Sequence, residues 1–139
     1  MLPDARVATF GGDDHPSLQV FSPPYLFKGL RPTITSAPSS VQLGEIFFVE
    51  TPDSADITQV TWIRPSAVTH TKNMNQRINK LSFTPVSGGL NVTAPFSANA
   101  CPPGHYLMFI INGSGVPSVA PFIQVSIGST TANDAPSVQ

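Results

Sequence analysis

Three histidines and one cysteine are the residues of this chain best suited to metal binding or covalent chemistry, and most of them lie far apart in sequence. The histidines are His15, His70 and His105, and the thiol is Cys101. Imidazole is the commonest transition-metal ligand in proteins, but a stable site needs about three or four ligands. On spacing alone, His70 is a candidate metal ligand without identifiable partners, and an ordinary loop residue is the alternative.

Cys101 excludes two kinds of site and is itself predicted to be inert. A single thiol can form neither a disulfide within the chain nor a cysteine-rich zinc site. It lies in a turn-like stretch, residues 100–104, where a free thiol is the prediction and a reactive or intermolecular role is the alternative.

No catalytic constellation can be assembled from the sequence. The serines fall outside any G-x-S-x-G elbow, and the eight acidic residues are scattered mainly through loops. Asp13 and Asp14, next to two glycines, could contact a calcium ion, but a solvated turn is the simpler interpretation. The sequence therefore predicts no catalytic residue.

The composition excludes several classes of partner. Only 11% of the 139 residues are charged and the net charge is -1, so there is no basic surface for nucleic acid or for a membrane. No apolar run reaches the roughly 18 residues of a membrane helix, and the N-terminus lacks the pattern of a signal peptide. Two N-glycosylation triplets, at Asn91 and Asn112, favour secretion only weakly.

Short strands separated by turns dominate the pattern, and 15 prolines and 10 glycines leave no room for long helices. This spacing predicts an all-β, immunoglobulin-like sandwich of about seven strands over residues 33–127, with Trp62 in its core. Residues 1–32 would hold two further strands (5–10 and 17–21) and a proline-rich linker (22–32). Residues 128–139 would form a flexible tail. The seven sandwich strands are predicted at residues 33–36, 45–50, 57–64, 78–86, 90–96, 105–112 and 118–127.

The most polar segment, SAVTHTKNMNQRINKL at residues 66–81, lies between two of these strands and contains His70. Its pattern T-H-x-x-N-x-x-Q-R, followed by PPGHYLMFIINGSGVPSVAPF, resembles the C-terminal domain of galactose oxidase, glyoxal oxidase and related copper radical oxidases. The opening residues, LPDARVATFGGD, are similar to the end of the kelch propeller that precedes this domain. The resemblance extends to about Val125.

The resemblance implies a fold and a partner. In this family the C-terminal domain is an early-set immunoglobulin-like sandwich, and one of its hairpins enters the central channel of the propeller. His70 matches the histidine that ligates copper from this hairpin. The other copper ligands, a Tyr-His pair and a tyrosine crosslinked to cysteine, belong to the propeller.

The 139 residues differ from the complete family pattern in their copper ligands and at one position of the hairpin. The propeller ligands have no counterpart here, and Tyr25, Tyr106 and Cys101 match other positions. Asn75 stands where the family often has an acidic residue. Because one imidazole cannot hold copper stably, we expect the chain by itself not to oxidise alcohols or aldehydes and to bind no copper tightly.

Partners and alternatives follow from the same comparison. The expected partner is a kelch propeller, and residues 5–21, with unpaired edges, are expected to repack on the sandwich or to pair with another copy. The resemblance implies an extracellular location. A free-standing immunoglobulin-like module that binds carbohydrate or protein, through Tyr25, Phe27 or Trp62, is the alternative, as is a remnant without a function of its own.

Overall fold

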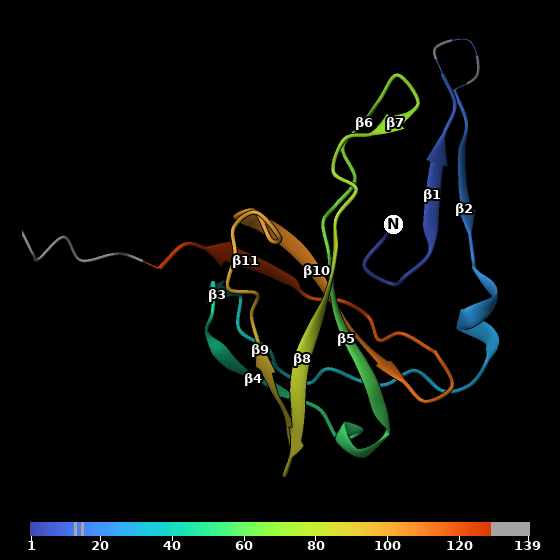
Figure 1. Cartoon of the computed structure of the whole chain (residues 1–139). Coiled ribbons are helices and arrows are strands. Elements are labelled where there is room, and N and C mark those ends of the chain that lie inside the picture. The colour runs from blue at the N-terminus through green and yellow to red at the C-terminus, as the bar shows by residue number, and fades with distance from the viewer. Residues whose placement is uncertain (13, 15, 129–139) are drawn as a thin grey trace, which may run out of the picture.

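The computed structural model describes residues 1–12, 14 and 16–128, and most of its regular structure is β-strand (Figure 1). The two short 3-10 helices of these residues are η1 (Pro24–Phe27) and η2 (Ser54–Asp56). No helix among them is long and apolar enough to cross a membrane. The strands are β1 (Val7–Phe10), β2 (Leu18–Phe21), β3 (Ser40–Gln42), β4 (Ile46–Glu50), β5 (Ile57–Ile63), β6 (Val68–Thr69), β7 (Lys72–Asn73), β8 (Ile78–Val86), β9 (Gly89–Thr93), β10 (Gly104–Asn112) and β11 (Phe122–Ser126).

Seven strands form one sheet that folds over on itself. Their order is β3-β11-β10-β5-β8-β9-β4, with β3 and β11 parallel and the other neighbours antiparallel. Strand β8 pairs with β5 through its first half and with β9 through its second half, so the sheet turns along β8. Phe47 of β4 stacks on Trp62 of β5 with ring centroids 5.7 Å apart, although β8 and β9 separate their strands. The two halves therefore face each other, and the predicted all-β immunoglobulin-like sandwich is confirmed.

The core lies between these halves and is built by period-2 alternation. Leu90 and Val92 of β9 are fully buried while Asn91 between them is exposed, as expected of a strand with one solvated face. Trp62 is fully buried, which confirms its prediction as a core residue. Burying a side chain of this size contributes roughly 1.5–3 kcal/mol.

One predicted sandwich strand is wrong. Residues 33–36 form only an isolated bridge between Ser36 and Glu50, and the strand at this edge is β3, four residues later. Pro38 interrupts the extended segment, because proline cannot donate a ladder hydrogen bond. In β3 a single residue, Val41, points into the core, so its apolar pattern is too short to stand out in the sequence.

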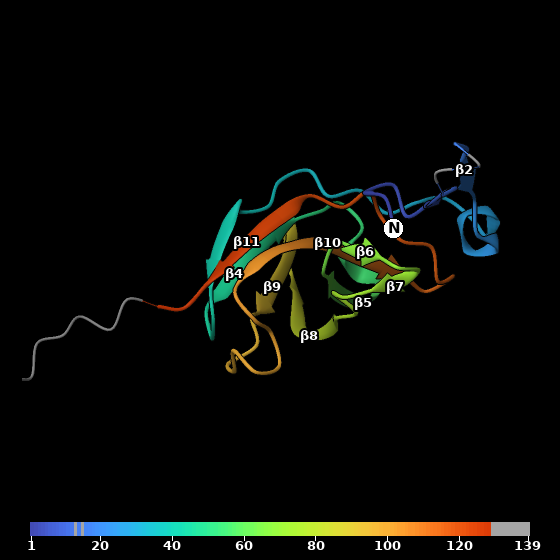
Figure 2. The ribbon, with the colours of Figure 1, turned by 90° about the horizontal axis from the view of Figure 1, so that it is seen from above.

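The N-terminal strands form a separate two-stranded ribbon. Strands β1 and β2 pair with each other, and Figures 1 and 2 show them at the end of the molecule away from β3 and β4. Within the described part of the chain the ribbon pairs with no other strand. The residues before it pack on the sandwich, where Ala5 is buried against Leu107, Phe109 and Ala120. The backbone N–H of Ala120 donates to the carbonyl of Pro3 at 2.8 Å.

The proline-rich segment 22–32 is more ordered than a plain linker. Tyr25 and Leu26, in helix η1, pack against the same cluster as Ala5, whereas Phe27 is 76% exposed. The domain boundaries at residues 32 and 127 stay a prediction. Of the expected tail, residues 129–139 lie outside the described residues.

Candidate metal-ligand site on a projecting hairpin

A narrow hairpin carries His70 away from the sandwich. Strand β5 ends at Ile63 and β8 begins at Ile78, and between them the short strands β6 and β7 pair antiparallel. Figure 1 shows this hairpin rising beyond the ends of β5 and β8, on the same side as the β1–β2 ribbon. The two strands of the core thus serve as its base.

The tip of the hairpin is a strained two-residue turn. Thr69 pairs with Lys72, and the two residues between them, His70 and Thr71, have φ of 50° and 65°. Two consecutive positive φ angles are the pattern of a type I′ turn, which asparagine and glycine normally occupy. For other residues the left-handed conformation costs roughly 1–2 kcal/mol each, and a β-branched threonine is a pronounced outlier. Such strain is concentrated at functional sites in proteins, which makes the tip a candidate.

Two hydroxyl groups hold the histidine at this tip. The hydroxyl oxygen of Thr69 lies 2.8 Å from Nδ1 of His70, and the hydroxyl of Thr71 donates to the His70 carbonyl at 2.6 Å. The His70 side chain is exposed. In the tautomer in which Nδ1–H donates to Thr69, Nε2 keeps a free lone pair, the arrangement typical of metal-ligating histidines.

The stem below the tip is closed by the side chain of Asn73. Its Oδ1 accepts from the backbone N–H of Ala67 at 3.2 Å and of Asn75 at 3.0 Å, and its Nδ2 donates to the Ser66 hydroxyl at 3.3 Å. The backbone N–H of Met74 donates to the Ala67 carbonyl at 2.8 Å. These bonds hold the two arms together where β6 and β7 are only two residues long.

Two arginines fasten the base of the hairpin to the loop before β10. Arg77 donates to the carbonyls of Asn99 and Ala100 at 3.2 and 3.3 Å. Arg64 donates to the carbonyl of Pro102 at 3.2 Å, and its guanidinium lies 5.6 Å from the centre of the Tyr106 ring. Both arginines are therefore occupied by structural contacts, which fix where the hairpin leaves the sandwich.

Cys101 and Tyr106 lie buried beneath this anchor. Cys101 is a free thiol in the loop before β10, as predicted, and its side chain is buried in the core cluster. Burial raises the pKa of its thiol, and burial, together with the neighbouring thiol, raises the pKa of Tyr106 to about 12. The Tyr106 hydroxyl donates to the Pro102 carbonyl at 2.6 Å. Neither side chain is available as a ligand.

Among the residues that the structure describes, no second histidine joins His70 in a metal-binding cluster. His105 is exposed on β10, Asp14 is exposed, and Asp13 and His15 lie outside the described residues. Across residues 1–12, 14 and 16–128, no cluster of three or more His, Cys, Asp or Glu side chains could hold a metal ion. For copper, the metal that the family resemblance implies, the residues fit the role of one ligand and not a complete site.

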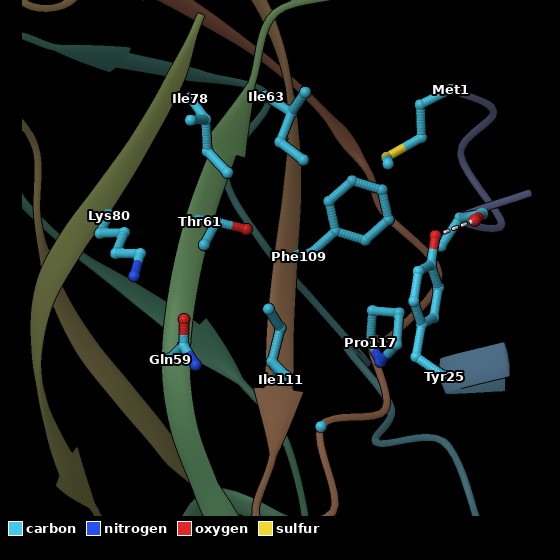
Figure 3. Close-up of a pocket in the computed structure, with 12 residues that line it drawn as sticks. Met1, Tyr25, Gln59, Thr61, Ile63, Ile78, Lys80, Phe109, Ile111 and Pro117 are labelled. Atoms are coloured by element: carbon cyan, nitrogen blue, oxygen red, sulfur yellow. Dashed lines mark hydrogen bonds between the residues drawn. The ribbon is translucent and has the colours of Figure 1, made fainter. Parts of the chain in front are cut away.

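A hollow lies on the outer face of β5 and β10, under the N-terminal segment. It encloses about 190 Å³, and Figure 3 shows Met1, Tyr25, Ile63, Phe109, Ile111 and Pro117 around it. The Tyr25 hydroxyl donates to the Ala5 carbonyl at 2.6 Å, the bond drawn there. The described lining residues include no histidine, cysteine or acid. This hollow thus seats the N-terminal segment, and the titratable side chains among its described lining residues are Tyr25 and Lys80.

The aromatic residues considered for carbohydrate binding do not form one surface. Trp62 is in the core, Tyr25 is half-buried in the hydrogen bond just described, and Phe27 alone is exposed. Because Trp62 lies in the core, as the sequence predicts, it cannot contribute to a binding surface.

Comparison with protein families decides the membership of the chain. Residues 31–125 match the model of the galactose oxidase-like early set domain. The chain belongs to this family. It is 34% identical over 140 residues to a galactose oxidase from Gibberella zeae, covering 91% of the chain and 20% of that protein. It is 33% identical over 149 residues to the aldehyde oxidase GLOX of Vitis pseudoreticulata, covering 90% of the chain and 28% of that protein.

A solved structure agrees with this early-set domain in three dimensions. It is a novel fungal alcohol oxidase of the AA5 family in complex with copper, 31% identical, with a TM-score of 0.78. The match covers 90% of the chain and 29% of the oxidase. The chain thus spans less than a third of the relatives it matches.

Proposed function

We propose that this early-set domain supplies one copper ligand, His70, to a copper radical oxidase whose remaining ligands belong to a kelch propeller. The observation that carries the proposal is the position of His70 in a strained turn at the tip of a projecting hairpin. The tight turn and its hydroxyl contacts would hold the imidazole at a fixed distance from the sandwich, and backbone strain of this kind is concentrated at functional sites. Family membership and the copper complex of the related oxidase support the same assignment.

In this proposal the residues of the chain have three tasks. His70 binds the metal through Nε2, Thr69 orients its ring by accepting from Nδ1–H, and the Asn73 stem with the Arg64 and Arg77 anchor sets the position of the tip. Copper, when bound with the propeller ligands, would supply the oxidation chemistry. The chain by itself is then an incomplete enzyme.

The proposed partner also accounts for the ribbon. Ala8, Phe10, Leu18 and Val20 alternate onto one face of β1–β2, and Phe10 is 77% exposed. A two-stranded ribbon is marginal on its own, so an apolar face of this kind calls for a covering surface. We propose that a propeller blade covers it and that pairing with a second copy is the alternative when no propeller is present. The family resemblance supports an extracellular location for such a protein.

The direct test combines the chain with a propeller. The 139-residue chain would replace the matching segment of the Gibberella zeae galactose oxidase, and copper content and peroxide production would be measured. We expect His70→Ala to lose both, whereas His105→Ala, which removes another exposed histidine, keeps them. Equal losses in the two variants would refute the assignment of His70.

A titration of the isolated chain tests its incompleteness. One imidazole should bind copper more weakly than micromolar, and His70→Ala should remove that binding. Submicromolar binding by the chain alone would show that it holds more of the site than one ligand.

A further inference from the structure

The two N-glycosylation triplets of the sequence have opposite environments. Asn112 is 8% exposed, and its side chain is in use: Nδ2 donates to the Leu30 carbonyl at 3.0 Å and Oδ1 accepts from the Val116 N–H at 2.9 Å. A sugar on Nδ2 would have to fit into this buried site, beside the Leu30 carbonyl that Nδ2 contacts. Asn112 is therefore a structural residue in the folded chain.

Asn91 stands at the centre of an exposed sheet face. It lies in the middle of β9, with Phe48 of β4 and Thr84 of β8 as its cross-strand partners. Its neighbours Leu90 and Val92 point into the core, so the Asn91 side chain points outward and is exposed. Thr93, the third residue of the triplet, follows two positions later on the same face.

A flat aromatic surface lies next to Asn91. The Phe48 ring covers Gly89: a methyl group added to Gly89 would lie 2.6 Å from Cζ and 2.8 Å from Cε2 of the ring. Phe48 is nevertheless 46% exposed, and Ile46, on the same face, is 67% exposed. An aromatic ring held against the sheet presents its outer surface to solvent beside the Asn91 amide.

We propose that Asn91 carries an N-linked oligosaccharide and that the Phe48 ring packs against its first sugar. The amide Nδ2 of Asn91 would attack C1 of a lipid-pyrophosphate-linked oligosaccharide on a glycosyltransferase of the secretory pathway. The new bond is N–C1, the C1–phosphate oxygen bond breaks, Nδ2 loses one proton and the lipid pyrophosphate leaves. The apolar face of the sugar then covers part of Phe48, which reduces apolar surface in water.

The location of Asn91 leaves the proposed partner surface free. Figures 1 and 2 both place β4 and β9 at the end of the molecule opposite the β2 strand of the ribbon. A glycan on β9 would thus be attached at a distance from the ribbon and from the hairpin that carries His70. The inference goes beyond the proposed copper role, and its test does not depend on that role.

Site occupancy is the first measurement. The full chain would be secreted from a eukaryotic host behind a cleavable leader. Its peptides would be deglycosylated enzymatically in heavy-oxygen water, which labels each formerly glycosylated asparagine, and analysed by mass spectrometry. We expect the label at Asn91 and not at Asn112, and we expect loss of the glycan in Asn91→Gln but not in Asn112→Gln. An unlabelled Asn91 in the secreted chain, or a glycan at Asn112, would overturn the proposal.

Thermal unfolding tests the contact with Phe48. Chain trimmed to a single sugar would be compared with chain made without sugar in a bacterial cytoplasm. We expect the sugar to raise Tm by about 3 °C, the size of an ordinary aromatic contact in a domain of this length. The gain should disappear in Phe48→Ala and persist in Ile46→Ala, which removes an exposed side chain from the same strand. An equal gain in Tm in the unsubstituted chain, in Phe48→Ala and in Ile46→Ala would overturn the role of Phe48.

Discussion

The side chain of Asn73 is the part of the hairpin whose removal should loosen the tip without unfolding the sandwich. Asn73→Ala deletes its three hydrogen bonds, to Ala67, Asn75 and Ser66. Since these bonds are exposed or half-buried, each should contribute about 0.5 kcal/mol, the lower end of the usual range. The sum, about 1.5 kcal/mol, corresponds to a roughly tenfold increase in hairpin opening.

Amide hydrogen exchange measures this opening directly. The N–H of Met74 bonds across the stem to Ala67, so its exchange should accelerate about tenfold in Asn73→Ala if exchange follows local opening. The core amides of β5 and β10 should keep their protection, because the hairpin contributes nothing to the buried cluster.

A matched variant separates the hydrogen bonds from the side-chain shape. Asn73→Asp keeps the oxygen that accepts from Ala67 and Asn75 and loses only the donor to Ser66. One bond of about 0.5 kcal/mol predicts roughly a twofold acceleration. Unchanged Met74 exchange in Asn73→Ala, or equal acceleration in both variants, would refute the reasoning.

Three further predictions concern the sandwich. Trp62→Ala should lower the free energy of unfolding by about 3–5 kcal/mol in urea titrations. Trp62→Phe should lower it much less, because this change also removes a buried indole N–H that has no partner among the described residues. Equal losses in the two variants would contradict this. Cys101 should resist thiol reagents until the chain unfolds. Because burial raises its folded pKa, the unfolded chain releases the proton first, so stability should fall as pH rises above about 8.5, the ordinary pKa of a thiol, and less steeply in Cys101→Ala. Gly89→Ala should destabilise the chain by about 1–3 kcal/mol, because its methyl group would collide with the Val49 carbonyl and the Phe48 ring; an unchanged Tm would show that this face adapts freely.

The strands were largely predictable because they carry long alternating or continuous apolar patterns. Strands β5, β8 and β10 have seven to nine residues each and lie where the sequence predicts them. Strand β3 was not predictable, since Val41 alone points inward and the strand depends on pairing with the distant β11. Pairing of that kind leaves no periodic signal in a three-residue segment.

The candidate site was only partly predictable. His70 was identified by its resemblance to a family pattern, but nothing in the letters of His70-Thr71 indicates a type I′ turn, which usually shows asparagine or glycine. The burial of Cys101 was missed because the surrounding prolines and glycine suggest an exposed turn. Long-range contacts from Arg64 and Arg77 fix the base of the hairpin against the loop that contains Cys101, and these contacts leave no pattern in the local sequence.

The path of β8 has a mechanical consequence. This strand begins where the hairpin ends, pairs first with β5 and then with β9, and so belongs to both halves of the sandwich. A force that pulls the hairpin along its length would be carried by β5 and β8 together. It would load their hydrogen bonds to β10 and β9 in shear, many at once, rather than peeling them one by one. The hairpin is therefore anchored in two paired strands of the sandwich, and its tip should hold its place under loads that would unravel a surface loop.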